Sequence, residues 1–173
     1  MTPVKPDLEN RIHDIVERLM ELDERAMLSY WIGAEIDEAE MYNALAKKAE
    51  EYSWDSRVAA LFRALAKESL NHAESLLTEY RQIYGGDALV DSDVPSIEVE
   101  LSSEELEEYV RSGRLSDLIE VLMEGEKIAR DIYAYMAERA SGSLRETLLK
   151  LSEIEDGHYS RLARLREELL RGG

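Results

Sequence analysis

Leucines recur along the last thirty residues of the chain at steps of three and four, the spacing of one face of a helix. They are Leu144, Leu148, Leu151, Leu162, Leu165 and Leu169. Between Leu151 and Leu162 the same face carries Glu155 and His158. A carboxylate and an imidazole on the buried side of a helix are costly unless something binds them. Because Glu-x-x-His on the inward face of a bundle is one way in which helices hold a metal ion, this face predicts a metal-binding helix.

The same periodicity predicts helices along most of the chain. Long helices are expected at residues 22–51, 56–84, 115–140 and 144–170, with shorter ones at 8–20 and 103–110. Asp55 can cap the helix that starts at residue 56, and Gly85-Gly86 can end it. The chain is therefore expected to be all-α.

The lengths of the connections predict how these helices pair. Few residues join the first long helix to the second, or the third to the fourth, so each pair should be antiparallel. The connection at 85–114 is long enough to follow a helix of about 40 Å from end to end. We therefore expect a single domain, residues 1–173, that forms a four-helix bundle with one long crossover between the second and third long helices.

Acidic residues interrupt the apolar face near the middle of each of the other long helices. The residues concerned are Glu35 and Glu38 on the first, Glu68 and His72 on the second, and Glu126 on the third. In addition, residues 34–49 resemble 125–140, and residues 65–76 resemble 151–162, which aligns His72 with His158. Matching interruptions on four helices predict two equivalent half-sites.

Several of these residues have a plainer interpretation. A single buried Glu35 or Glu126 could form an ion pair with Arg63 or Arg130, and Glu38 could belong to a solvated flank. Tyr42 and Tyr133 lie two turns beyond Glu35 and Glu126, where they are either hydrogen-bond donors behind the ligands or ordinary packing residues. His13 has no partner pattern and is expected to be a surface or packing histidine.

Composition limits the classes of partner. A net charge of −17 opposes binding to nucleic-acid phosphates. No apolar run is long enough for a membrane span, and the first residues show no apolar signal segment. The chain has no cysteine, which excludes disulfides and thiolate metal sites and is compatible with the cytoplasm.

Over residues 22–52, 55–84 and 115–170, this pattern resembles the ferritin-like di-iron carboxylate superfamily, and within it the rubrerythrin-like branch without a rubredoxin domain. The resemblance implies one Glu from each of two helices and Glu-x-x-His from each of the other two. By position, the single glutamates are Glu35 and Glu126, and the second half has its motif in Glu155 and His158.

The first half departs from the family pattern. Ser69 stands three residues before His72, where the motif has Glu, and the nearest acid is Glu68. Rubrerythrins also carry an additional Glu one turn along the third helix, where this chain has Ala129, whereas Glu38 has that spacing on the first helix. The ion near His72 is expected to bind Glu35, Glu68 and His72, with Glu38 in contact with it or just behind, and the ion near His158 to bind Glu126, Glu155 and His158.

The resemblance implies two iron ions, with manganese or zinc as alternatives, and an oxidoreductase that reacts with peroxide or O₂ in oxidative stress. A ferroxidase linked to iron storage and a non-catalytic metal-binding or interaction bundle are the alternatives. Because the chain has no cysteine, electrons would come from a separate donor protein or from Fe(II) itself. Trp31, Trp54 and Phe62 add apolar surface beyond the need of one core, so a homodimer is expected.

Overall fold

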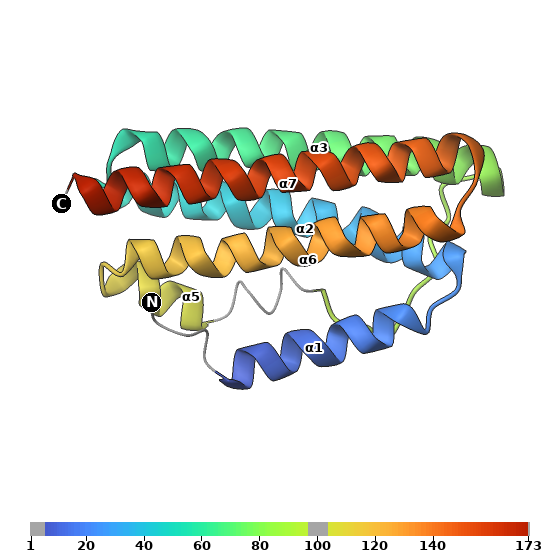
Figure 1. The fold of residues 1–173 in the computed structure, drawn as a ribbon, viewed down its shortest axis with the longest axis horizontal. Coiled ribbons are helices and arrows are strands. Elements are labelled where there is room, and N and C mark those ends of the chain that lie inside the picture. The colour runs from blue at the N-terminus through green and yellow to red at the C-terminus, as the bar shows by residue number, and fades with distance from the viewer. Residues whose placement is uncertain (1–5, 97–103, 173) are drawn as a thin grey trace. The chain divides into compact units, whose positions relative to one another are not determined.

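The computed structural model describes residues 6–96 and 104–172, and every regular element in these ranges is a helix. The helices are α1 (Pro6–Met20), α2 (Glu24–Glu51), α3 (Ser56–Tyr84), α5 (Glu104–Arg111), α6 (Leu115–Arg139) and α7 (Gly142–Arg171) (Figure 1). The chain divides into two compact units, residues 1–103 and 104–173. Unit 1 contains α1 to α3 and unit 2 contains α5 to α7.

In unit 1, α2 and α3 lie side by side and run in opposite directions (Figure 1). Asp23 caps α2, because its carboxylate accepts a hydrogen bond of 2.8 Å from the backbone N–H of Ala26. Asp55 caps α3 in the same way through the N–H of Arg57, at 2.9 Å. At the other end of α3, Gly85 has φ of +76°, a left-handed conformation that glycine adopts without strain. Local capping residues therefore fix where this pair of helices begins and ends.

Apolar side chains hold α2 against α3. Trp31, Leu28 and Tyr42 from α2 and Phe62 and Leu65 from α3 are almost completely buried. The rings of Tyr42 and Phe62 lie 5.8 Å apart, a distance at which aromatic rings attract each other. Burial of a Leu or Phe side chain stabilises a fold by about 1.5–3 kcal/mol. This core keeps the facing sides of the two helices in a fixed register.

The segment after α3 is tied back to unit 1 by hydrogen bonds. The guanidinium of Arg25 donates to the hydroxyl of Tyr80 at 2.8 Å, and that hydroxyl donates to the carbonyl of Ala88 at 2.6 Å. The backbone N–H of Val90 donates to the Ser29 hydroxyl at 3.0 Å. The start of the long connection is therefore held by side chains of α2 and α3.

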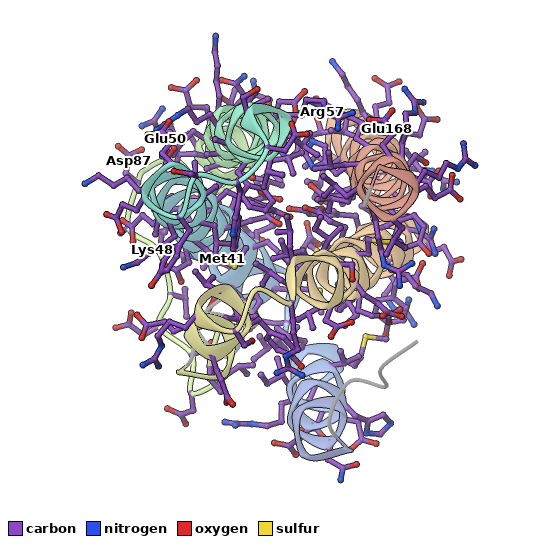
Figure 2. All side chains as sticks on the ribbon, turned by 90° about the vertical axis from the view of Figure 1, so that its left-hand side faces the viewer. Met41, Lys48, Glu50, Arg57, Asp87 and Glu168 are labelled. Carbon is purple, nitrogen blue, oxygen red and sulfur yellow. The ribbon has the colours of Figure 1, made fainter. Side chains whose placement is uncertain are left out.

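The outer faces of α2 and α3 carry charged side chains, among them Lys48, Glu50 and Arg57 (Figure 2). Arg63 donates to Glu50 at 2.6 Å, and Lys48 lies 3.5 Å from Glu51. Exposed ion pairs of this kind contribute at most about 1 kcal/mol each. These pairs therefore contribute little to the stability of unit 1.

In unit 2, α6 and α7 form a second antiparallel pair (Figure 1). A tight turn joins them, in which Gly142 has φ of +61°. The hydroxyl of Ser152 donates to the carbonyl of Arg130 at 2.9 Å, and the Arg166 guanidinium donates to the carbonyl of Ser116 at 3.3 Å. The leucines of the α7 face are buried, except Leu169, which is half-buried. The periodicity in the sequence therefore identified the buried side of this helix correctly.

The structure confirms the all-α class, the pairing of consecutive long helices and the long connection at 85–114. Expected helix ends agree within two residues for the four long helices, and residue 103, the expected start of the short helix, lies outside the described ranges. Among the described residues, no helix is both long and apolar enough to cross a membrane. The expectation of one domain over 1–173 stays a prediction.

Candidate metal centre

Three predicted ligands come together in unit 2. Glu126 lies near the middle of α6, and Glu155 and His158 lie one turn apart on α7. The Nδ1 atom of His158 is 3.5 Å from Oε2 of Glu126 and 3.6 Å from Oε2 of Glu155. All three residues are at most 1% exposed, and one donor atom from each lies within 4.8 Å of the other two. This geometry brings two carboxylates and an imidazole to one buried point.

Proton affinities in this trio are strongly shifted. Burial raises the pKa of Glu126 well above its usual range, and the nearby carboxylate of Glu155 raises it further, while His158 partly opposes both. Burial by itself lowers the pKa of His158, but hydrogen bonding and attraction to Glu126 and Glu155 outweigh it and raise the pKa. Both shifts show that the trio attracts positive charge. A divalent cation would compete with protons for these atoms, because ligating His is neutral and ligating Glu is ionised.

The donor set of unit 2 fits a first-row transition metal. Carboxylate oxygens and imidazole nitrogens suit divalent iron, manganese and zinc. Buried leucines stand before and after the trio on the same two helices, and they limit the access of water. They are Leu122, Leu151 and Leu162. An ion bound to Glu126, Glu155 and His158 would therefore lie in a medium where charge interactions are strong.

Unit 1 holds a second cluster on the facing sides of α2 and α3. The Nδ1 atom of His72 is 3.4 Å from Oε2 of Glu35, and both side chains are buried. Glu38 is only 6% exposed. The hydroxyl of Ser69 lies 2.8 Å from Oε2 of Glu38 and 2.9 Å from the carbonyl oxygen of Leu65. The structure thus brings Glu35, Glu38 and His72 to the interior of unit 1, with a serine hydroxyl bound to one carboxylate.

The positions of the remaining predicted site residues do not test the roles that were expected for them. Glu68 is half-buried on α3, between the interior and the surface. Tyr42 and Tyr133 are buried, and Tyr42 packs on the ring of Phe62. The ligand role of Glu68 and the hydrogen-bonding role of the two tyrosines stay predictions.

Arg63 and Arg130, which were the alternative ion-pair partners of the buried glutamates, instead pair with acids at the surface. Arg63 binds Glu50, and Arg130 binds Asp131 and Asp156 at 3.0 and 2.8 Å. His13 is exposed and lies 3.8 Å from Glu17 in the next turn, as expected for a surface histidine. Glu38 is buried, so the interpretation as a solvated flank is wrong.

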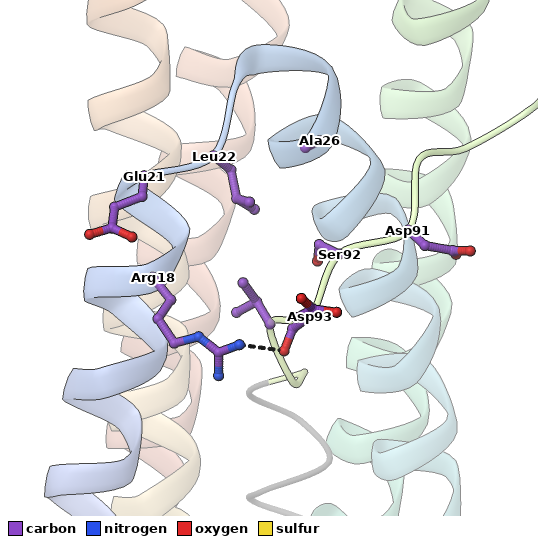
Figure 3. Close-up of a pocket in the computed structure, with 8 residues that line it drawn as sticks. Arg18, Glu21, Leu22, Ala26, Asp91, Ser92 and Asp93 are labelled. Atoms are coloured by element: carbon purple, nitrogen blue, oxygen red, sulfur yellow. Dashed lines mark hydrogen bonds between the residues drawn. The ribbon is translucent and has the colours of Figure 1, made fainter.

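A separate pocket of about 440 Å³ lies in unit 1 (Figure 3). It is lined by Arg18, Glu21, Leu22, Ala26, Asp91, Ser92, Asp93 and Val94. The guanidinium of Arg18 points toward the residues of the long connection and donates to the carbonyl of Asp93 at 2.6 Å. The lining contains none of the predicted ligands, so we assign this pocket a structural role in fastening the connection to α1.

Sequence reasoning missed the hydrogen bond between Ser69 and Glu38. In the sequence Ser69 stood only as a departure from Glu-x-x-His. Its hydroxyl bonds to a residue that lies 31 positions earlier, on the other helix of the pair. A signal for this bond was present in the sequence. Ser69 is three residues before His72 and Glu38 is three residues after Glu35, so in an antiparallel pair in which Glu35 faces His72, Glu38 also faces Ser69.

Comparison with known proteins agrees with this geometry. A hypothetical protein from Pyrococcus furiosus has the same fold, with a TM-score of 0.71 and 23% sequence identity over 90% of this chain and 96% of that one. No curated protein matches the chain. The family model for rubrerythrin matches residues 26–166, which include both clusters of buried Glu and His side chains. The chain therefore has the ferritin-like all-α fold and belongs to the rubrerythrin family.

Proposed function

We propose that this protein is a two-metal carboxylate oxidoreductase that binds two ions, iron in the first place, and reduces peroxide or O₂. The observation that carries the proposal is the buried trio of Glu126, Glu155 and His158 in a member of the rubrerythrin family. A surface cluster of acids would not support it, because such clusters are common in a chain with a net charge of −17. Burial of two carboxylates beside an imidazole makes the difference.

The second ion is proposed for the cluster around His72 and Glu35. Both clusters combine carboxylates with one imidazole, and in both the Nδ1 atom faces a carboxylate oxygen. The family resemblance implies two ions, one for each half-site. Two iron(II) ions together supply the two electrons that, with two protons, convert peroxide into two waters.

The residues of the chain have three tasks in this proposal. Glu126 and Glu155 supply negative charge that offsets the charge of the ion. The Nδ1 atom of His158 faces both carboxylates, so it is the nitrogen that would share an ion with them. Because the metal-free trio holds protons tightly, Glu126 and His158 would release a proton when an ion binds.

Electrons for repeated turnover are proposed to come from a separate donor protein. Rubredoxin-type iron needs four thiolates, and this chain has no cysteine. In a single turnover, stored Fe(II) can serve as the reductant.

Anaerobic loading with Fe(II), followed by peroxide or O₂, tests the proposal. We expect about two iron ions per chain and loss of one peroxide for every two Fe(II) oxidised. Faster oxidation with O₂ than with peroxide, together with iron retained as a mineral core, would identify a ferroxidase. Tight metal binding with no oxidation by either reagent would identify a structural metal protein, and absence of binding would overturn the proposal.

A further inference from the structure

Two pairs of facing side chains line the interior of unit 1. Glu35 of α2 faces His72 of α3, with 3.4 Å between Oε2 and Nδ1. Three residues further along α2 and three residues earlier on α3, Glu38 faces Ser69, with 2.8 Å between Oε2 and the hydroxyl. The equal steps are what an antiparallel pair in fixed register requires, since residues three apart lie on the same side of a helix.

Unit 2 repeats this arrangement with one exchange. Glu126 of α6 faces His158 of α7, as Glu35 faces His72. By the same antiparallel register we infer that Ala129 of α6 lies opposite Glu155 of α7; both residues are buried, and the Glu155 carboxylate is 3.6 Å from Nδ1 of His158. Each unit therefore has a Glu–His pair followed by a pair of one Glu and one small residue. In unit 2 the second Glu is on the later helix, and in unit 1 it is on the earlier helix.

We propose that Glu38, bound by the Ser69 hydroxyl, supplies the second carboxylate of the metal site at His72, in place of the glutamate that Glu-x-x-His would put at position 69. This inference rests on the proposed function and specifies one half of its centre. It gives both half-sites the same donors, two carboxylates and one imidazole. Ser69 is a positioning residue, because it acts through Glu38.

The hydroxyl of Ser69 suits this task. It has one proton and two acceptors within reach, the Glu38 carboxylate and the carbonyl of Leu65. Because the hydroxyl has a single proton, it can donate fully to only one of these acceptors at a time, and donation to the charged carboxylate is the stronger bond. Hydrogen bonds from outer partners orient ligating carboxylates, and their loss typically weakens metal binding about 10- to 100-fold.

Glu68 is the competing source of the second carboxylate. It lies beside Ser69 on α3 but is half-buried, whereas Glu38 and Ser69 are 6% and 0% exposed. Removal of the carboxylate at position 38 or at position 68 therefore distinguishes the two candidates. Gln has nearly the same volume as Glu and keeps hydrogen-bonding ability, which preserves packing in both variants.

The experiment titrates the full chain with Fe(II) under anaerobic conditions. Bound iron is measured by elemental analysis, and its location by anomalous diffraction from crystals of each variant. We expect Glu38→Gln to lose iron at His72 and to keep it at His158, whereas Glu68→Gln keeps both ions. Ser69→Ala should weaken binding at His72 about tenfold or more and leave binding at His158 unchanged.

Exchange of the two positions gives the sharpest test. The double variant Glu38→Ala with Ser69→Glu rebuilds in unit 1 the order seen in unit 2, with a small residue on α2 and Glu on α3. We expect Glu38→Ala alone to lose iron at His72 and the double variant to bind it there again, whereas iron retained at His72 in Glu38→Ala alone would show that Glu38 is not a ligand. Circular dichroism of every variant confirms folding before titration.

The possible failures are distinct. A wild-type chain that binds no iron overturns both the proposed function and this inference. A wild-type chain that binds two ions, with iron at His72 lost in Glu68→Gln and retained in Glu38→Gln, overturns only the assignment of Glu38. Failure of the double variant to regain iron at His72, while it is folded and still binds iron at His158, also overturns the exchange.

Discussion

At the scale of single residues, the strongest evidence is the burial of acids that are close to each other. Glu126 and Glu155 would repel each other as two carboxylates in a medium of low dielectric constant. A proton, the imidazolium of His158 or a bound cation relieves this repulsion. The first two require the trio to take up a proton, whereas a divalent ion can bind both ionised carboxylates and the neutral imidazole at once.

Removal of either carboxylate in unit 2 should therefore reduce metal content. We expect Glu126→Ala and Glu155→Ala each to lose about one of two bound ions, with little change in helix content, because the leucines of α6 and α7 still pack. Elemental analysis and circular dichroism measure the two effects. Glu124→Ala and Glu153→Ala are matched controls, since both acids are exposed on the same helices. Unchanged metal content in both ligand variants would contradict the assignment.

Periodicity in the sequence predicted which acids face inward. It identified Glu35, Glu126, Glu155, His72 and His158, because an interruption of an apolar face is a property of one helix and is visible along the chain. The bond between Ser69 and Glu38 was not predictable in this way. It depends on the register between two helices, which the packing of side chains such as Trp31 sets in three dimensions.

At the scale of elements, helix ends follow from local residues, and the same reasoning shows where sequence prediction was less exact. Asp55 and Gly85 were expected at the ends of α3, and they are there, because a capping bond involves only neighbours in sequence. The start of α2 was expected near Leu22, but Asp23 caps a helix that begins at Glu24. Leu22 continues the apolar spacing into the turn, so hydrophobic pattern alone extends the helix too far.

The cap of α3 should make stability depend on pH. Hydrogen bonds from the side chain and then the backbone N–H of Arg57 lower the pKa of Asp55 to about 2. A lowered folded-state pKa stabilises the fold above the unfolded-state value near 3.8, and this contribution disappears as pH falls toward about 2. We expect Asp55→Ala to melt roughly 2–4 °C below wild type at pH 6, with the difference shrinking at pH 2.5.

Thermal unfolding followed by circular dichroism at several pH values measures this difference. Asp55→Asn serves as the control, because its side chain still accepts from a backbone N–H but carries no charge. A difference between wild type and Asp55→Ala that is the same at pH 6 and pH 2.5 would show that the charge of Asp55 contributes nothing.

The connection after α3 offers a second test at this scale. The Tyr80 hydroxyl is bonded both to Arg25 and to the carbonyl of Ala88, in a buried position. We expect Tyr80→Phe to destabilise the fold by about 1 kcal/mol and to lower the melting temperature by roughly 2–4 °C. Tyr52→Phe, at an exposed ring, should leave the melting temperature unchanged. Equal melting of Tyr80→Phe and wild type would mean that the bonds do not stabilise the connection.

At the scale of the whole molecule, metal binding and folding should be linked. An ion that binds the folded chain and not the unfolded one stabilises it by about 2.7 kcal/mol at a free concentration 100 times its Kd. We expect Fe(II), added without oxygen, to raise the melting temperature, and a chelator to reverse the effect. The double variant Glu126→Ala with Glu155→Ala should respond much less.

Net charge requires a control in that measurement. With a charge of −17, the chain repels itself, and any cation can stabilise it by screening. Sodium chloride at matched ionic strength measures this general effect, and Mg²⁺ at the same concentration measures the effect of divalent charge without preference for imidazole. Stabilisation of equal size by Mg²⁺ and Fe(II) would argue against a specific site.

The expected homodimer stays a prediction, and the structure changes its basis. Trp31 and Phe62 are buried within the chain, and Trp54 is half-buried, so these aromatic residues are not spare surface. Light scattering would show a dimer as a mass twice the 19.8 kDa of the chain.

The second glutamate is on the earlier helix in unit 1 (Glu38, facing Ser69) and on the later helix in unit 2 (Glu155, with Ala129 on the other helix). This difference has a consequence for how such proteins diverge. Positions that face each other across an antiparallel pair share one location in space, although many residues separate them in the chain. A carboxylate can therefore move from one helix to its neighbour in two substitutions, through an intermediate with acids at both positions. A search for Glu-x-x-His along single helices would pass over the descendants of such a move, whereas a search for facing pairs would find them.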